Sequence, residues 1–487
     1  MADLGRLRPP LLSIRMLTDA QLDEVHRATL AILSGTGVRV QSPPAVDLLV
    51  AAGSSVSDGD LVKIPEAVIE AALELAPPQV NLYSRTGELR LELTEFNTYF
   101  GTGSDLPHTI DLVSSERRPS VLADVKAYAR LCDCLENLDF VMSMAQASDV
   151  PMRTSDRHSF LAMMENTIKP IVYTVWDTAG VGDIVKMAEM VAGGTDRLAE
   201  KPFMLAYLEP TSPLVHSEEV LAKMFALADR GLPFVYAPGP MEGASAPVTS
   251  AGSLAMANAE CLSGLAIAQL RHPGTPVVFG SGSGPLDMKT TVGTYSSPEF
   301  MHHCLGMAEL AHHRYKLPVW GFSGCSDSKL PDIQAGIDSA LWILWTALSG
   351  ANLVHDLGYI EAGLTGSFEM VVVAEDIVSY VRRLMSGIEV SPSTLAVDVI
   401  DEVGPGGNFL STAHTLQHFR SVWQPSLFDR NNHHGWVEAG RPNMIRTARE
   451  VAMEAIGSHV PEALPGGLQE ELEEIVTQAD RQAGAEA

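Results

Sequence analysis

The sequence predicts an α/β fold, a (β/α)8 TIM barrel with helical N- and C-terminal extensions, and three observations support it. Between about residues 97 and 390, eight short apolar runs rich in β-branched and aromatic residues alternate with long amphipathic runs. Successive short runs begin roughly 35 residues apart, which suits one strand followed by one helix. Several short runs directly follow a proline, which keeps the chain extended as it enters a sheet.

The short runs predict eight strands, and the long runs predict the helices between them. The expected strands cover residues 98–102, 140–146, 171–175, 203–208, 234–237, 277–280, 319–322 and 353–356. The expected helices include 119–135, 181–191, 217–230, 251–270, 298–315 and 333–349, with a last element at 368–385. The alternative is an open, doubly wound sheet, which usually carries a Gly-rich phosphate loop after an early strand. The stretch GTGSDL after the first expected strand lacks the GxGxxG spacing, so the barrel is favoured.

The pattern divides the chain into three parts. Residues 1–96 form a helical N-terminal extension, in which Thr18 and Gln21 make a capping-box pattern at a helix start. Residues 97–390 form the barrel, and residues 391–487 form a helical C-terminal extension. The last, acidic helix is expected to pack on the outside of the barrel or on another subunit, which leaves a homo-oligomer open.

Composition narrows the class of protein. The 487 residues carry a formal net charge of -27, and a surface this acidic repels phosphate backbones, so nucleic acid is not an expected partner. The five cysteines are odd in number and form no CxxC pair, which is typical of a reducing compartment. Prolines interrupt the first residues where a signal peptide needs an apolar run, and residues 339–354 are too few to span a membrane. We therefore expect a cytoplasmic protein without a membrane partner.

The active site of such a barrel lies in the loops that follow the carboxyl ends of the strands. Polar, Gly-flanked residues gather at nearly all of these ends. They include Asp105, Gln146, Thr174, Asp177, Glu209, Ser281, Ser283, Asp327, Lys329, His355 and Asp356. Each also has a structural interpretation: a turn, a helix cap, or a core histidine with a backbone partner. Their convergence on one end of the sheet is what favours a functional site.

A metal site is a rival interpretation, because three histidine pairs occur at 302–303, 312–313 and 433–434. Adjacent residues on a helix point about 100° apart, so the first two pairs, which fall in an expected helix, cannot share one ion. The sequence has no HExxH and no Cys/His set at zinc spacing. We therefore predict no protein-bound metal.

Three long stretches are similar to a known family. The segments YAPGPMEGASAPVTSAGSLAMANAECLSGLAIAQL and PGTPVVFGSGSGPLDM begin at Tyr236 and Pro273, and WGFSGCSDSKLPDIQAG begins at Trp320. All three resemble the trimethylamine methyltransferase family, with a match that runs from about Pro9 to about Ile456. The resemblance implies a (β/α)8 fold and transfer of a methyl group from a methylated amine to the cob(I)alamin of a separate corrinoid protein. This chain has no DxHxxG motif, so we expect it to bind no cobalamin itself.

The resemblance also bears on the substrate. Trimethylamine enzymes of the family carry pyrrolysine in the barrel, at a position that falls within or beside residues 324–328 here. This chain has ordinary residues there, Gly-Cys-Ser-Asp-Ser, and so resembles the branch without pyrrolysine, which includes glycine betaine methyltransferase. Neutral trimethylamine would leave as an amide anion, whereas a quaternary ammonium leaves as a neutral amine. A small quaternary amine is therefore the expected substrate.

This chemistry assigns roles to residues at the strand ends. Aromatic faces attract a quaternary ammonium, at about 0.5–2 kcal/mol each. The aromatic candidates are Tyr99, Tyr173, Trp176, Tyr207, Tyr236, Phe322 and Tyr359. Glu209, Asp327 and His355 are the catalytic candidates, with Glu209 compensating the ammonium and Lys329 binding a substrate carboxylate.

Two other functions stay open at this point. One is a metal-dependent TIM-barrel lyase or hydrolase. The other is a family member that binds a quaternary amine without turnover, which nothing in the sequence excludes.

Overall fold

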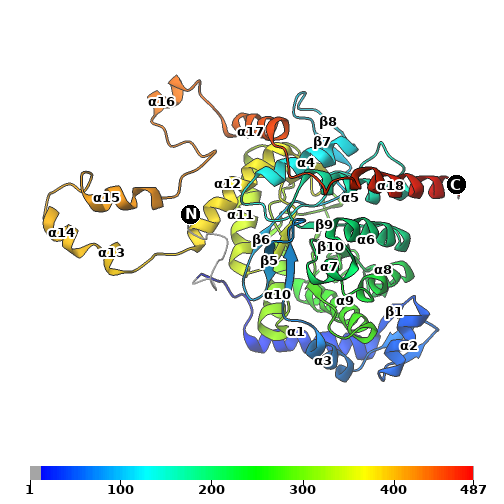
Figure 1. The fold of residues 1–487 in the computed structure, drawn as a ribbon. Helices are drawn as coiled ribbons and strands as arrows, with labels where there is room; N and C mark the ends of the chain where they lie inside the picture. The colour runs from blue at the N-terminus through cyan, green and yellow to red at the C-terminus, as the bar shows by residue number, and fades with distance from the viewer. Residues whose placement is uncertain (1–11, 486–487) are drawn as a thin grey trace.

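The computed structural model describes residues 12–485, and a seven-stranded parallel sheet lies at its centre (Figure 1). Residues 1–11, which bear on the expectation of no signal peptide, lie outside the described residues. The strands are β6 (Tyr99–Phe100), β9 (Ile171–Tyr173), β10 (Met204–Leu208), β12 (Phe234–Tyr236), β13 (Val277–Gly280), β16 (Val319–Phe322) and β17 (Leu353–His355). Seven of the eight expected strands are thus present.

The order of the strands follows the order of the chain. The sheet runs β6-β17-β16-β13-β12-β10-β9, so each strand from β9 to β17 lies beside its successor. The first strand, β6, pairs with the last, β17, at Tyr99↔Leu353. Nearly every strand residue is buried, because helices cover the outer face and side chains fill the inner one.

The remaining expected strand, residues 140–146, forms three isolated parallel bridges instead, the third between Ala145 and Leu106. Phe140 bridges to Gly101 next to β6, and Val141 bridges to Ile171 of β9. Further along, the Thr102 hydroxyl takes the place of a backbone partner: it accepts from the Met142 amide at 2.9 Å and donates to the Met142 carbonyl at 3.1 Å. Met144 then takes a left-handed backbone (φ 55°), which ends the extended path. Side-chain bonding and this turn explain why the segment is not a strand.

Helices surround the sheet (Figure 1). They are α4 (Leu122–Cys134), α5 (Ser155–Asn166), α6 (Thr178–Ala192), α7 (Thr195–Glu200), α8 (Glu218–Ala228), α9 (Ser250–Arg271), α10 (Pro298–Glu309), α11 (Ile333–Ser349) and α12 (Phe368–Met385). Among residues 12–485, α9 is the one helix long and apolar enough to cross a membrane, and most of its residues are buried inside the fold.

The N-terminal extension is mixed rather than purely helical. Its helices are α1 (Asp19–Ala31), α2 (Pro43–Ala51) and α3 (Glu66–Leu75), and the predicted Thr18–Gln21 capping box is present. It also contains β1 (Val38–Val40), β2 (Ser55–Ser57) and β3 (Leu61–Lys63), which form a sheet with β11 (Val215–His216), and the hairpin of β4 (Val80–Tyr83) and β5 (Leu89–Leu93). Most of these strands have only three residues, too few to show a clear alternation of polar and apolar positions.

Loops at the carboxyl ends of the strands form structure of their own. The loops after β6 and β17 contribute a small sheet of β18 (Tyr359–Ile360), β19 (Thr365–Gly366), β7 (His108–Ile110) and β8 (Arg117–Pro119). The loop after β13 forms the hairpin of β14 (Leu286–Asp287) and β15 (Val292–Gly293). These loops surround the site described below.

The C-terminal extension has a projecting and a packed part (Figure 1). Its projecting helices are α13 (Pro392–Leu395), α14 (Val397–Val403), α15 (Ala413–His418) and α16 (His433–Glu438). The chain then returns as α17 (Met444–Ser458), which packs against α12 and α4, and α18 (Leu468–Ala485), which packs against α6. The acidic last helix therefore lies on the outside of the helical layer of its own chain.

Candidate active site

Side chains from three strand ends meet at one edge of the sheet. We call them the carboxyl-end cluster: Tyr207, Glu209, Phe322, His355, Asp356 and Tyr359. Ring contacts hold the group together, since His355 lies 4.3 Å from Phe322 and 6.4 Å from Tyr207 between ring centroids. Five of the six were predicted as site residues, and Asp356 was recognised only as a strand end.

His355 is a buried, neutral histidine with a fixed tautomer. Its Nδ1 lies 2.9 Å from the Gly321 carbonyl oxygen, which can only accept, so Nδ1 carries the proton and Nε2 does not. Burial lowers the pKa of His355 to about 3. The ring also packs against Trp320 at 4.1 Å. His355 therefore presents a lone pair at Nε2 in the neutral pH range.

Asp356 lies beside this histidine. Its Oδ1 lies 3.3 Å from His355 Nε2. Complete burial raises the pKa of Asp356 well above its usual value. Asp356 also has a left-handed backbone (φ 79°), an unfavourable conformation for a non-glycine residue that is concentrated at functional sites.

Tyr359 ties this pair to the first strand. Its hydroxyl donates to the Ser104 carbonyl at 2.6 Å. A methyl group added at Gly103 would lie 2.2 Å from the Tyr359 hydroxyl and 2.3 Å from Asp356 Oδ1. Only glycine fits at position 103, because any side chain would displace both groups.

Glu209 is crowded by neighbours yet keeps an accessible carboxylate. Tyr207 donates its hydroxyl to Glu209 Oε2 at 3.3 Å and lies 3.4 Å from the Ala237 carbonyl. Loss of water around the carboxyl raises the pKa of Glu209 above 4.5. No Lys or Arg within residues 12–485 forms an ion pair with it.

A cavity of about 300 Å³ lies beside the cluster, between the ends of β6, β9 and the bridged segment 140–141. Its lining includes Asp105, Gln146, Ser155, Asp156, Thr174, Trp176 and Lys223. Asp105 accepts hydrogen bonds from Thr174 at 2.5 Å and Ser143 at 3.2 Å, and its backbone is left-handed (φ 58°). Loss of water raises the pKa of Asp105, and half of the Trp176 surface is exposed here.

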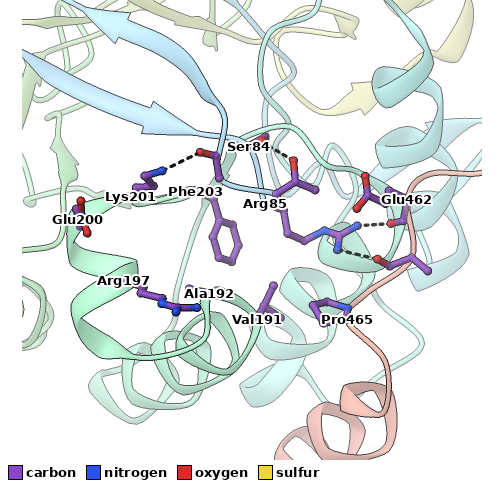
Figure 2. A pocket seen from close by; sticks show the side chains of 13 residues that line it. Ser84, Arg85, Val191, Ala192, Arg197, Glu200, Lys201, Phe203, Glu462 and Pro465 are labelled. Carbon is purple, nitrogen blue, oxygen red and sulfur yellow. Dashed lines mark hydrogen bonds between the residues drawn. The ribbon is translucent and has the colours of Figure 1, made fainter.

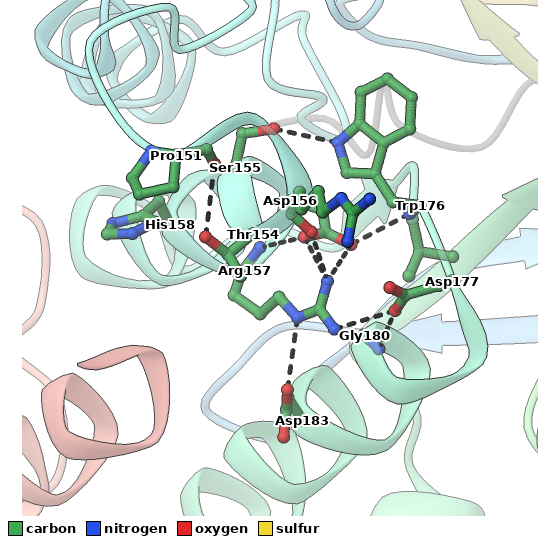
Figure 3. Close-up of polar contacts among 12 residues, drawn as sticks. Pro151, Thr154, Ser155, Asp156, Arg157, His158, Trp176, Asp177, Gly180 and Asp183 are labelled. Atoms are coloured by element: carbon green, nitrogen blue, oxygen red, sulfur yellow. Dashed lines mark hydrogen bonds and ion pairs between the residues drawn. The ribbon is translucent and has the colours of Figure 1, made fainter. Parts of the chain in front are cut away.

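A buried arginine holds Trp176 in place (Figure 3). Arg157 on α5 pairs with Asp156 at 3.0 Å, Asp177 at 2.8 Å and Asp183 at 3.2 Å. Asp156 in turn accepts from the Trp176 amide at 3.0 Å, and the indole N–H donates to Ser155 at 3.0 Å. The ion pairs thus fix the loop after β9 against α5, which orients the indole toward the cavity.

Lys223 supplies a cation at the same cavity. Its Nζ donates to the Val175 carbonyl at 2.9 Å and to the Trp176 carbonyl at 3.4 Å. Burial lowers the pKa of Lys223. An ammonium has three N–H donors, so these two carbonyls leave one for a ligand.

The other predicted site residues lie apart from the cluster. Asp327 accepts from the backbone amides of Tyr295 and Ser296, at 2.8 and 3.4 Å, and so holds a loop. Lys329 is exposed, and its ammonium donates to the Asp327 carbonyl at 2.8 Å. Neither side chain is held in an arrangement that points to catalysis.

Three predicted aromatic residues also face elsewhere. The Tyr99 hydroxyl accepts from the Glu92 amide on β5 at 3.1 Å. Tyr173 packs edge-on against Phe160 of α5 at 5.2 Å, between the sheet and the helices. Tyr236 is buried and bonds to His216 Nδ1 at 2.6 Å. Of the seven aromatic candidates, Trp176, Tyr207, Phe322 and Tyr359 lie at the site.

Sequence reasoning missed Lys223, Tyr295 and the selection of Asp105 and Asp356. The strand-end rule did name the two acids, but only Glu209, Asp327 and His355 were given a catalytic role. Lys223 lies in the second turn of α8, where no strand-end rule applies. Tyr295 stands after the β14–β15 hairpin, and its pKa is raised by burial and by nearby Asp356 and Glu209, which puts its ring beside the cluster.

A second cavity, of about 590 Å³, lies before β10, on the side where the strands begin (Figure 2). Its buried cation bonds the backbone: the Arg85 guanidinium donates to the carbonyls of Thr167, Glu462 and Ala463, which uses three of its five N–H donors. Lys201 donates to the Gly87 carbonyl at 3.4 Å. The polar groups here connect the hairpin β4–β5 to the chain before α18.

No group of three or more His, Cys, Asp and Glu side chains within residues 12–485 is arranged to hold a metal ion.

The chain is similar to known methyltransferases over nearly its full length. A family described as Trimethylamine methyltransferase (MTTB) matches residues 3–484. The trimethylamine methyltransferase MttB of Desulfitobacterium hafniense (strain DSM 10664 / DCB-2) is 32% identical over 99% of this chain and 98% of its own length. The glycine betaine methyltransferase of Desulfitobacterium hafniense (strain Y51) is 29% identical over 99% of this chain and 100% of its own length.

Among solved structures, the fold is similar to the monomethylamine methyltransferase (MtmB) of Methanosarcina barkeri. The TM-score is 0.54 at 11% identity, over 96% of this chain and 90% of that one. At this identity the likeness concerns the fold alone.

Proposed function

The chain belongs to the trimethylamine methyltransferase family, and on that premise we propose that it demethylates a quaternary methylated amine, glycine betaine or a close relative. The methyl acceptor is the cob(I)alamin of a separate corrinoid protein, which supplies the nucleophile. We further infer that the seven-stranded sheet and the bridged residues 140–141 together form a closed eight-stranded barrel. We also propose that the protein is cytoplasmic.

One observation carries the proposal: two carboxyl groups flank aromatic surfaces, and neither forms an ion pair with a Lys or Arg among the described residues. Asp105 and Glu209 both have raised pKa values from lost hydration, and neither is ion-paired with a Lys or Arg of residues 12–485. Trp176 and Tyr207 stand beside them. A permanent cation offsets the cost of two poorly hydrated carboxylates, and its methyl groups suit aromatic faces.

A quaternary ammonium also suits a site without an electrophile that could activate a neutral amine. Such a substrate leaves as a neutral amine, so it needs positioning and exclusion of water rather than an electrophile. In the loop at residues 324–328, Cys325 is completely buried, and burial raises the pKa of its thiol well above the usual value. Ser326 bonds to the backbone of Tyr359 at 3.0 Å and to Asp338 at 2.7 Å. These residues hold the loop against Tyr359 of the cluster and offer no group that would activate a neutral amine.

We assign the substrate carboxylate to Lys223 in place of Lys329. Lys223 reaches the cavity that also contains Asp105 and Trp176 and keeps one N–H donor for a ligand. Lys329 instead bonds its own loop from an exposed position. A small zwitterion would place its ammonium by Asp105 and Glu209 and its carboxylate at Lys223.

The corrinoid protein is proposed to dock beside the carboxyl-end cluster. Helix α11 begins in the loop after β16 and exposes Ile333, Ile337 and Leu341, which are four residues apart and share one face. Leu330 extends this stripe toward the cluster. An exposed apolar stripe next to an open site is typical of a protein interface.

The test is a side-by-side assay of the purified protein with cob(I)alamin and either glycine betaine or trimethylamine. Absorbance reports the formation of methylcob(III)alamin. We expect methylation from glycine betaine, and faster methylation from trimethylamine would overturn the proposal. Betaine binding without turnover would identify a non-catalytic binder, and activity that requires a bound metal would identify a lyase or hydrolase.

A further inference from the structure

Tyr295 reaches the site from the loop after β13, which is the middle one of five neighbouring strands. The sheet order places β16 and β17 on one side of β13, and β12 and β10 on the other. Asp356 follows β17, and Glu209 follows β10. Burial raises the pKa of the Tyr295 hydroxyl, and the carboxyl groups of Asp356 and Glu209 both raise it further. A hydroxyl that interacts with strand ends on both sides of β13 lies between them, over the carboxyl end of the sheet.

The backbone of Tyr295 is held by the segment that runs from β16 into α11. Asp327 Oδ1 accepts a hydrogen bond from the Tyr295 amide at 2.8 Å. The Trp342 indole N–H donates to the Tyr295 carbonyl at 2.9 Å, and the Cys325 thiol lies 3.7 Å from the same oxygen. Both polar groups of the Tyr295 backbone are therefore fixed, and so is the point from which its side chain extends.

The ring of Tyr295 is also confined by its neighbours. It packs edge-on against Phe300, with 5.3 Å between centroids, and Phe300 lies 5.4 Å from Phe322 of the carboxyl-end cluster. A methyl group added at Gly363 would lie 3.2 Å from Tyr295 Cζ, so the hydroxyl end of the ring lies close to the loop after β17. The side chain thus has little freedom to turn away from the cluster.

The hydroxyl of Tyr295 differs from those of the two other tyrosines at the site. Tyr207 donates to Glu209, and Tyr359 donates to the Ser104 carbonyl. The Tyr295 hydroxyl has no hydrogen-bond partner within residues 12–485, and its side chain is only partly buried. A phenol that is held this firmly and yet leaves its hydroxyl unused is arranged to contact a ligand.

We propose that Tyr295 closes the ammonium site between Glu209 and Asp356 and limits the size of the N-alkyl groups that fit there. This inference rests on the proposed function. An aromatic ring attracts a quaternary ammonium, and a ring that cannot move aside excludes groups larger than methyl. Asp327 is then a positioning residue, because it contacts no substrate and acts by holding the Tyr295 amide.

The test measures the dissociation constants of the full chain for tetramethylammonium and tetraethylammonium by isothermal titration calorimetry. The wild type should bind tetramethylammonium more tightly. Tyr295→Ala should weaken tetramethylammonium binding about tenfold, because an aromatic contact with the cation is lost. The same variant should bind tetraethylammonium at least as tightly as the wild type does, since the ring no longer occupies the space. Tyr295→Phe keeps the ring and should retain the wild-type preference.

Tyr83→Ala is the matched control. Tyr83 is also partly buried, but it lies on β4, next to the cavity where the strands begin. Its removal should leave both dissociation constants unchanged.

The positioning role of Asp327 has its own measurement. Asp327→Ala should change the ratio of the two dissociation constants in the same direction as Tyr295→Ala, and combining the two substitutions should add nothing further. Asp327→Asn keeps an acceptor for the Tyr295 amide and should restore most of the preference. A residue that only stabilises the fold would not alter this ratio.

The outcomes separate this inference from the proposed function. If the wild type binds tetramethylammonium and Tyr295→Ala keeps the wild-type ratio, the inference is wrong and the proposed function stands. If the wild type binds neither cation, the proposed function fails and the inference fails with it.

Discussion

Two cavities lie at opposite ends of the same sheet, and they differ in size and in the state of their polar groups. The cavity where the strands begin has about 590 Å³ and contains Arg85, whose guanidinium is satisfied by three backbone carbonyls. The cavity where the strands end has about 300 Å³ and contains Asp105, and Glu209 follows the neighbouring strand β10. Both carboxyls have raised pKa values and no cationic partner among the described residues.

The comparison shows that carboxyl groups without an ion-pair partner identify a candidate site better than the volume of a cavity does. At the first cavity, the buried Arg85 connects three segments of the chain through their backbone carbonyls. At the second, poorly hydrated carboxylates, a half-exposed indole and a lysine with a free donor converge. Strained backbone also occurs where the strands end, since Asp105 and Asp356 both have left-handed conformations there.

The largest expected effect comes from Gly103→Ala. The added methyl group would collide with the Tyr359 hydroxyl and with Asp356, so both must move away from their bonded positions. A displacement of about 1 Å in an active site can cost about 100-fold in rate. We expect a loss of this size in kcat/KM, measured by methylation of cob(I)alamin.

Gly87→Ala, at the larger cavity, is the control for this prediction. A methyl group there meets no atom within 4 Å, but the φ of 89° is unfavourable for alanine. It should lower stability by about 1 kcal/mol and leave the rate unchanged. Equal rates for the two variants would remove the distinction between the two ends.

Next in size is Glu209→Gln, which keeps the shape of the side chain and removes its charge. Without the carboxylate the ammonium loses its main counter-charge, and kcat/KM should fall at least tenfold, or about 1.4 kcal/mol. Glu200→Gln, at the other cavity, is the matched control and should retain wild-type activity. Both variants should unfold at temperatures close to that of the wild type.

Lys223→Met should have a smaller and substrate-dependent effect. We expect the KM for glycine betaine to rise about fivefold, or about 1 kcal/mol, because one charge-assisted hydrogen bond is lost. Tetramethylammonium has no carboxylate and should bind both proteins alike. Lys329→Met should change neither KM. If Lys329→Met weakens betaine binding and Lys223→Met does not, our assignment of the carboxylate is wrong.

The smallest expected effect concerns pH. The pKa of folded Glu209 lies above 4.5, so the KM for a cationic substrate should begin to rise at a higher pH than for an ordinary glutamate as the pH falls. Stability has the opposite trend: an acid with a raised pKa favours folding below its unfolded pKa and loses that contribution as the pH rises through its folded pKa. Glu209→Gln should therefore be slightly more stable than the wild type at pH 7 but not at pH 4. Identical KM–pH profiles for the two proteins would contradict this.

The sequence predicted the sheet better than it predicted the site. The predicted strands at 277–280 and 319–322 have the same bounds as β13 and β16. A short, continuous apolar run is typical of a buried parallel strand, so the sequence predicts such strands well. The segment 140–146 is similarly apolar, yet the backbone of Met142 bonds to the Thr102 hydroxyl where a strand would bond to another backbone. A pattern of apolar residues cannot predict such a side-chain hydrogen bond.

The face of the sheet toward which a side chain points explains which site residues could be predicted. The strand-end rule found Glu209 and His355, since their place follows from the end of a strand. It also selected Tyr173, which the alternation of strand side chains turns toward α5. Lys223 approaches the cavity from a helix, and only the packing of α8 against the sheet brings it there.

The Thr102 hydroxyl has a consequence for motion. Residues 140–146 are joined to their neighbours by three isolated bridges and this one side chain, whereas β10 forms continuous ladders with β9 and with β12. Local opening needs the least free energy where backbone bonds are fewest, so the amides of this segment should exchange with solvent before those of β10. Gln146 and the Ser143 that bonds Asp105 belong to it. The side of the cavity that carries Gln146 is therefore expected to move more readily than β10, and under the proposed function this asymmetry suits a site that admits a methylated amine and releases a smaller one.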